Sequence, residues 1–446
     1  MLGWGIVLIL VGSLLASLRP GGRGAASRRP IDPAKLADPQ KLHGHVTAWG
    51  WNIAAKSMRA LVPDFQKRYP NVDVNVEMTA ANIQTRFLLS LAAGEGAPDV
   101  MMVQLHEAPR YIATGRMADL TAVAAKYQKD FPPAAWANCT GADGHVYAIP
   151  WDVGPCGVFY KRDLFARYGI DPGKIETWDD YLAAGQKMLK ESGGRTKMLP
   201  LGTQNLVHVF EIMLRQLGGQ VFDAQGRVAI DSPEARRVIN LIARLRDAGI
   251  CAEVEYFKHE WLASFNDDTI ASYPLAVWLS GTIKDTTGEY SDKRANWGLF
   301  KLPAMEPGGR RSSNLGGSSL IIPDQCANKE AAFAFIEYAL CTREGQVAQF
   351  RNYNIFPAYL PALEDPFFRQ PDPFFGGQPL GAFFAEGVKD LPVMYRTSDW
   401  TETQDYLTQS LTGWATTPAP SRPSAQQLLH TLAGKLHRRL GREIAP

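Results

Sequence analysis

The sequence of 446 residues is poor in cysteine, and its five cysteines form no metal-binding motif. Cys139, Cys156, Cys251, Cys326 and Cys341 show no CxxC or CxxH spacing, which argues against a structural zinc site. The helix expected between the last two separates its ends by roughly 18 Å, beyond the ~7 Å Cα limit for a disulfide. A pairing of the first two stays open, but we expect free and mostly buried thiols.

The sequence also lacks an excess of charge of one sign and any signature of catalysis. Its 47 Lys+Arg against 45 Asp+Glu leave a net charge of +2, so no strong field favours nucleic acid as a partner. GxSxG, HExxH, GxxxxGKS and GxGxxG are missing from the strand-to-helix junctions, and the eight histidines do not pair at metal-ligand spacing. We therefore expect no catalytic residues, no metal and no cofactor.

One long apolar run exists, at residues 2–18, and Arg19, Arg23, Arg28 and Arg29 follow it. Its length is typical of a secretory h-region. No basic residue precedes the run, and no cysteine ends it to accept a lipid. A cleaved export signal and an uncleaved anchor both stay open, with residues 1–43 forming this segment and a linker.

The composition that remains is that of a globular protein with many aromatic residues. A hydrophobic content of 46% and a charged content of 21% exclude a disordered chain, and the length favours two domains. Aromatic residues make up 10%, including 11 Trp, and exposed rings of this kind serve as flat surfaces for ligands.

The pattern after the linker predicts alternating strands and helices. Residues 72–78 alternate apolar and polar, residues 100–103 are continuously apolar, and helical spacing fills the segments between the expected strands. A β-α-β-α-β order builds an open α/β sheet, in which ligands lie at the carboxyl ends of strands. At these ends stand Trp49, Trp51, Asn52, Gln104 and Glu107.

Residues 143–186 are the stretch around which the rest is organised. A turn leads to a short strand that Pro150 is expected to stop, then an irregular crossing with Gly154 and Gly157, a second strand, and a helix capped by Thr177 and Asp180. Locally, a strand pair inside one domain and a crossing between two domains are equally good interpretations. The β-α order before the stretch and the helices after it favour the crossing, with residues 153–157 as a hinge.

Further elements are predicted in the second half. Apolar runs predict strands over 270–280, 297–303 and 318–322, and helical spacing appears over 207–217, 233–248, 331–340 and 394–411.

Four segments in a fixed order carry a resemblance to a known family: residues 97–100, 144–165, 316–320 and 328–332. Over about residues 44–434 the chain resembles the extracellular solute-binding proteins of ABC importers, family 1, which are sugar-binding and maltose-binding-protein-like. The resemblance implies an α/β, two-lobed periplasmic-binding-protein fold, type II-like. Each lobe would be a mostly parallel sheet flanked by helices, with a ligand cleft between the lobes. The lobes are expected at 44–153 plus 281–354 and at 154–280 plus 355–446.

The resemblance also implies further ligand-binding residues. Trp151 and Asp152 would lie at the first crossing, and Ser280 and Gly281 at the end of a strand lining the cleft. Gly316 and Gly317 would give a backbone approach, and Trp400, with Tyr395 nearby, would stack on a sugar ring. Where the family commonly continues Gly-Pro-Trp, this chain has Gly281-Thr282-Ile283, so one stacking surface is missing.

The function implied is that of a monomeric, hinge-closing protein that captures a carbohydrate, outside the cytoplasm, and presents it to the permease of an ABC transporter. Its contact with the membrane would be through the N-terminal segment or the permease, at the periplasmic or extracellular face. One alternative keeps the fold but binds glycerol 3-phosphate or another polyol phosphate through Arg86, Arg110 or Arg351. Another is a glycan-processing hydrolase.

Overall fold

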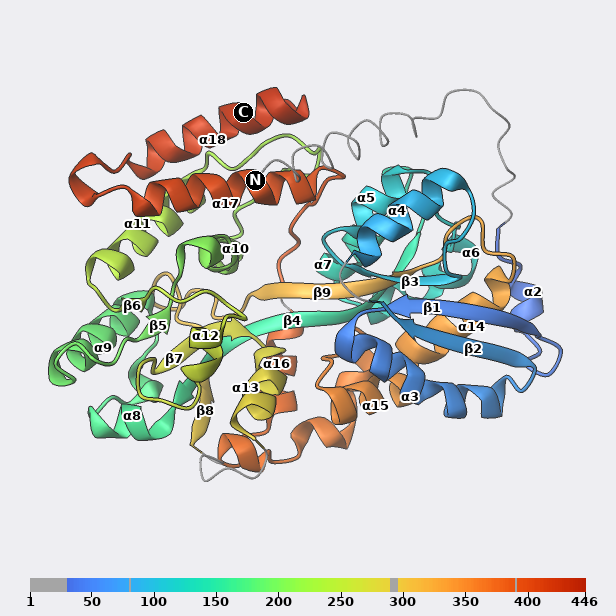
Figure 1. Ribbon diagram of the computed structural model, residues 1–446, viewed down its shortest axis with the longest axis horizontal. Helices are drawn as coiled ribbons and strands as arrows, with labels where there is room; N and C mark the ends of the chain where they lie inside the picture. Colours follow the sequence, from blue (N-terminus) through green and yellow to red (C-terminus); the bar gives the residue numbers. More distant parts are fainter. Residues whose placement is uncertain (1–29, 80–81, 289–295, 390) are drawn as a thin grey trace. The chain divides into compact units, whose positions relative to one another are not determined.

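The computed structural model describes residues 30–79, 82–288, 296–389 and 391–446 (Figure 1). The apolar run at 2–18 and the arginines after it lie outside the described residues, so the signal or anchor stays an expectation. The chain divides into a first unit, ending at Asp152 and resuming over Gly317–Ala362, and a second unit of Val153–Gly316 and Leu363–Pro446.

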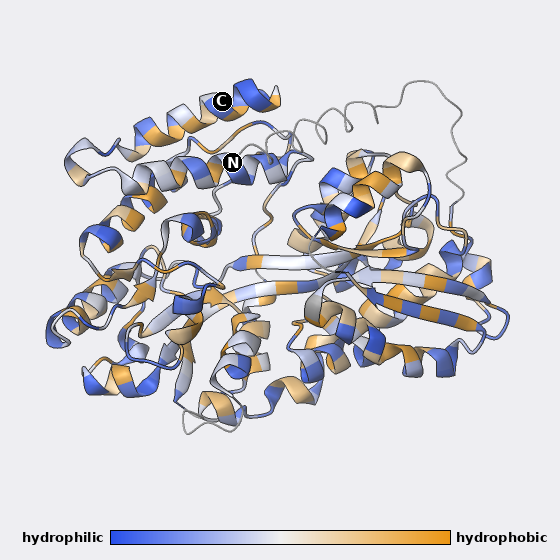
Figure 2. Cartoon of the chain, in the orientation of Figure 1, coloured by the Kyte–Doolittle hydropathy of each residue, from blue (hydrophilic) through white to orange (hydrophobic). Residues whose placement is uncertain are grey.

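The first unit is built on a sheet with the strand order β2-β1-β3-β9. Strand β1 (Gly44–Gly50) runs parallel to β2 (Val72–Met78) and to β3 (Val100–Gln104), and β9 (Asn314–Ile321) runs antiparallel to β3. Apolar and polar residues alternate along β2, as Figure 2 shows, and the apolar ones are buried. The strand predicted over 72–78 is confirmed.

Helices cover both faces of this sheet (Figure 1). Helix α3 (Asn52–Arg68) and helix α14 (Lys329–Leu340) pack together on one face, while α4 (Ile83–Ala93) and α5 (Ala108–Ala113) lie on the other. The other α-helices among the described residues of the unit are α2 (Pro33–Leu36), α6 (Thr121–Ala124), α7 (Pro133–Trp136) and α15 (Arg343–Tyr353).

The second unit contains β4 (Ala148–Lys161), which pairs antiparallel with β7 (Ser272–Ala276) and with β8 (Trp297–Phe300). The mostly parallel sheet expected for this unit is corrected here, because both strands that pair with β4 run antiparallel to it. A short parallel pair, β5 (Leu199–Pro200) and β6 (Cys251–Ala252), accompanies it. The α-helices among the described residues of the second unit are α8 (Arg162–Arg167), α9 (Trp178–Glu191), α10 (Leu206–Gln216), α11 (Pro233–Asp247), α12 (His259–Ala263), α13 (Leu279–Thr287), α16 (Leu380–Val388), α17 (Trp400–Thr416) and α18 (Ala425–Leu440).

Strand β4 corrects the prediction of two strands with an irregular crossing between them. It is one strand of 14 residues that continues through Pro150 and Gly154. A Cβ atom at Gly154 would lie 1.9 Å from the carbonyl oxygen of Leu315, so the glycine permits a close backbone approach and does not interrupt the strand. The boundary between the units falls inside β4, after Asp152. A hinge at 153–157 stays a prediction.

Residues 281–316 belong to the second unit, whereas the sequence interpretation assigned them to the first. The reason is local pairing: β8 is hydrogen-bonded to β4 from Val158 to Lys161, and α13 follows β7 after a two-residue connection. The second crossing lies inside β9, where the boundary falls between Gly316 and Gly317.

Several local predictions are confirmed. Thr177 and Asp180 form the capping box of α9, and the helix predicted over 233–248 is α11. All five cysteines, each within the described ranges, are free, and four are buried. None of the helices in the described part of the chain combines the length and apolar character that a membrane span requires.

Candidate functional site

The first unit brings together the ends of β1 and β3, where five site residues were predicted. Trp49 lies in β1 beside Met101 of β3, and Gln104 ends β3. Trp51 is the N-cap of α3, and Glu107 is the N-cap of α5. Asn52 is the first residue of α3. The carboxyl-end placement expected of these residues therefore holds for their backbone positions.

Trp49 has one face covered by a cation. The Arg86 guanidinium carbon lies 3.9 Å from the centroid of its ring, a cation–π contact, and the tryptophan itself is 3% exposed. Its Nε1 is buried and has no hydrogen-bond partner among the described residues. A buried indole N–H without an acceptor costs stability.

Glu107 carries a second unsatisfied polar atom. Its Oε2 and the hydroxyl of Tyr111 are both buried, and neither has a hydrogen-bond partner within the described part of the chain. Burial raises the pKa of the Glu107 carboxyl, and burial with the nearby Glu107 charge raises the pKa of Tyr111. Tyr111 was missed in the sequence, although its place four residues after Glu107 on a helix puts both on one face.

Trp151 and Asp152 are neighbours in β4, but their side chains have different contacts. Trp151 is fully buried and donates from Nε1 to the side-chain oxygen of Gln349 at 2.6 Å, so it packs inside the first unit. Asp152 accepts a hydrogen bond from the Ser318 hydroxyl, and burial raises the pKa of its carboxyl. Of the two, Asp152 keeps the character of a polar site residue.

The two glycines of β9 have the backbone that their predicted role requires. Gly316 has φ +87° and Gly317 has φ +110°, a region that side-chain-bearing residues rarely adopt. A Cβ atom at Gly316 would lie 3.6 Å from the Trp278 indole nitrogen, and the Gly317 carbonyl accepts from the Leu105 amide at 2.9 Å.

Ser280 and Gly281 do not end a strand, which corrects the prediction for 270–280. Strand β7 ends at Ala276, and both residues lie in the first turn of α13. The periodicity of a run of apolar residues does not distinguish a buried strand from a buried helix start, and Leu279 and Ile283 are the buried helical positions here. The buried Ser280 hydroxyl has no hydrogen-bond partner in the described ranges.

Tyr395 and Trp400 are close in sequence but differ in exposure. Tyr395 is 39% exposed, whereas Trp400 is 1% exposed. The Arg396 guanidinium carbon lies 3.4 Å from the centroid of the Trp400 ring, and Arg396 pairs with buried Glu211 at 2.7 Å. Neither Arg396 nor Glu211 was predicted. The four-residue spacing from Arg396 to Trp400 would place both side chains on one face of a helix. However, α17 begins only at Trp400, so this spacing does not account for their contact.

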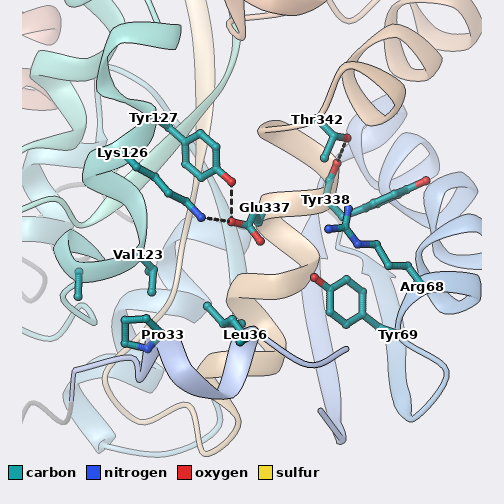
Figure 3. Close-up of a pocket in the computed structure, with 12 residues that line it drawn as sticks. Pro33, Leu36, Arg68, Tyr69, Val123, Lys126, Tyr127, Glu337, Tyr338 and Thr342 are labelled. Atoms are coloured by element: carbon teal, nitrogen blue, oxygen red, sulfur yellow. Dashed lines mark hydrogen bonds and ion pairs between the residues drawn. The ribbon is translucent and has the colours of Figure 1, made fainter. Parts of the chain in front are cut away.

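A separate cavity of about 410 Å³ lies in the first unit, and no predicted site residue lines it (Figure 3). Its wall holds Glu337, which accepts from the Tyr127 hydroxyl at 2.6 Å and from Lys126 at 3.0 Å. The described residues contain no group of three or more His, Cys, Asp or Glu side chains arranged to hold a metal ion.

The two-unit α/β fold is shared with solved extracellular solute-binding proteins. A crystal structure of an extracellular solute-binding protein of family 1 superposes with a TM-score of 0.73 at 23% identity, covering 87% of this chain and 99% of that one. The model of the family described as bacterial extracellular solute-binding protein matches residues 50–343, and the chain belongs to that family.

Characterised relatives cover most of the chain. An arabinooligosaccharide-binding protein from Halalkalibacterium halodurans is 26% identical over 316 residues, which are 69% of this chain and 67% of that protein. A lactose-binding protein from Rhizobium radiobacter is 25% identical over 388 residues, which are 81% of this chain and 86% of that protein.

Proposed function

We propose that this protein is the extracytoplasmic substrate-binding component of an ABC transporter and that it binds a mono- or oligosaccharide without chemical turnover. The observation that carries the proposal is the family membership together with relatives named for oligosaccharide and lactose binding, one of which covers 81% of the chain. The permease of the transporter is its partner, and the protein acts as a monomer, exported or held by its N-terminal segment.

The polar atoms of the first unit support a carbohydrate ligand. A sugar hydroxyl both donates and accepts hydrogen bonds, so it satisfies the Trp49 Nε1–H as an acceptor and the Glu107 carboxylate as a donor. Aromatic and apolar walls with a few placed polar groups are the usual composition of a small-ligand site. A polyol phosphate would add an anion, for which Arg86, Arg110 and Arg351 of this unit are the predicted cations.

Isothermal titration of the purified chain against lactose, β-1,6-galactobiose, maltose, arabinobiose, mannitol and glycerol 3-phosphate tests the proposal. We expect at least one sugar to bind with a nanomolar-to-micromolar Kd, a range common for preformed sites. Stronger binding of glycerol 3-phosphate than of every sugar would replace the sugar by a polyol phosphate. Chromatographic detection of shortened products after incubation with the oligosaccharides would instead show an enzyme.

A further inference from the structure

A buried ion pair in the second unit links α10 to the segment that precedes α17. Arg396 donates from Nη2 to Glu211 Oε2 at 2.7 Å, and the two side chains are 3% and 5% exposed. Burial lowers the pKa of Arg396, and the positive charge of Arg215, one helical turn after Glu211 on α10, lowers it further. These three side chains therefore carry one positive charge in excess.

The Arg396 guanidinium has more hydrogen-bond donors than its partners use. A guanidinium carries five N–H donors. Nη2 donates to Glu211, whereas Nε and Nη1 are buried and have no hydrogen-bond partner among the residues that the structure describes. Burying the donors of a charged group without acceptors costs free energy. The guanidinium would therefore gain from an acceptor that a ligand brings.

The start of α17 lies against the same guanidinium. The Arg396 guanidinium carbon lies 3.4 Å from the centroid of the ring of Trp400, the first residue of this 17-residue helix. The N-cap residue Asp399 pairs with Arg442 at 2.7 Å instead of capping the helix, and the buried Thr401 hydroxyl has no hydrogen-bond partner in the described part of the chain. The N-terminus of a helix carries a partial positive charge. Arg396 and this helix end therefore favour an anion together.

We infer that the saccharide bound by this protein carries a carboxylate, as in a uronic acid, and that Arg396 binds this group. The inference rests on the proposed function and narrows its ligand. A carboxylate supplies acceptors to the unpartnered N–H groups and also balances the excess positive charge, whereas a neutral hydroxyl supplies an acceptor alone. A sugar with a carboxylate is therefore expected to bind more tightly than the same sugar without it.

Matched pairs of acidic and neutral sugars test the inference by isothermal titration: glucuronic acid with glucose, galacturonic acid with galactose, and digalacturonic acid with digalactose. In at least one pair the acid should bind the wild type about tenfold more tightly or better, since one charge-assisted hydrogen bond of ordinary size changes Kd by about that factor. Arg396→Met removes the donors and the charge, so the acid should lose this advantage. Arg396→Lys keeps the charge and should retain part of the advantage.

The control is Arg422→Met, because Arg422 lies 5.2 Å from the ring centroid of Trp414 on the same helix and pairs with Asp247 at 2.9 Å. This variant should keep the wild-type ratio of the two Kd values. Each variant is titrated at a temperature at which circular dichroism shows it to be folded. An acid that binds the wild type no more tightly than its neutral partner, or that keeps its full advantage in Arg396→Met, overturns the inference and leaves the proposed function standing. Absence of binding to every acidic and neutral sugar overturns the proposed function as well.

Discussion

Two aromatic residues of the second unit show opposite environments. Trp400, which the resemblance implies as a stacking residue, is 1% exposed and has the Arg396 guanidinium over its ring. Phe257, which no pattern in the sequence singled out, is 62% exposed and stacks on Trp278. The first ring is packed inside the unit, and the second is largely exposed to solvent.

The difference teaches that the surroundings of an aromatic residue, more than its type, decide its role. Trp400 is buried because Arg396 and Phe222 fill the space at its faces and edge, and Arg396 is fixed by Glu211. The Phe257 ring stacks on Trp278 and is otherwise largely exposed to solvent. Three experiments sharpen or break this comparison.

The largest effect is expected from Glu211→Gln. Glu211 and Arg396 form an ion pair at 2.7 Å with side chains 5% and 3% exposed, and Arg215 adds a second positive charge, since its presence lowers the pKa of Arg396. Removing the carboxylate leaves the buried Arg396 side chain and the nearby Arg215 without this counter-ion. We expect the free energy of unfolding, measured by urea denaturation, to fall by about 3–5 kcal/mol.

The matched comparison is Arg396→Met, which leaves Glu211 with Arg215 and should cost roughly half as much. Asp268→Asn removes the exposed pair with Arg167, 2.6 Å long and about half exposed on both sides, and should change stability by about 0–1 kcal/mol. Equal losses in Glu211→Gln and Asp268→Asn would show that the Arg396 pair is not a buried structural element.

An intermediate effect is expected from Trp400→Phe. The smaller ring leaves a void and a weaker contact with Arg396, so the free energy of unfolding should fall by about 1–3 kcal/mol. The sugar Kd should change less than twofold. A tenfold loss of affinity in titrations at a temperature where the variant is fully folded would show that Trp400 does contact the ligand.

The parts of the fold that the sequence predicted best are those set by local chemistry. The alternation of β2 and the capping box at Thr177 depend on neighbours in the chain, so both are confirmed at their predicted residues. The carboxyl-end residues Trp49 and Glu107 followed from strand order alone.

The parts that the sequence did not predict depend on distant partners. Pro150 and Gly154 indicate a break, yet β4 continues through them because Gly154 allows the close approach of Leu315. The helical start at Ser280 and the burial of Trp400 depend likewise on packing within the second unit. The exposure of Phe257 had no signal, since its φ of +64° is a property of the folded loop and not of the residue type.

The smallest effect is a pH dependence of the free energy of unfolding, which we expect from His208. Burial lowers the pKa of His208, whose ring stacks on Tyr256, from its ordinary 6.5, while the charges of Glu211 and Glu255 oppose the shift. The unfolded chain therefore binds a proton more readily than the folded one, so stability is fully present above pH 6.5 and is lost as the pH falls toward the folded-state value. The wild type should lose stability between pH 7.5 and pH 5.5, because the unfolded chain takes up more protons than the folded chain over this range. His208→Gln, whose side chain stays neutral, should lose less free energy of unfolding over the same pH range, measured by urea denaturation.

Trp400→Phe should keep the wild-type dependence of stability on pH, because the Arg396 guanidinium beside Trp400 stays protonated across this range. Identical slopes for His208→Gln and the wild type would mean that the histidine exchanges protons as freely in the folded protein as in the unfolded chain.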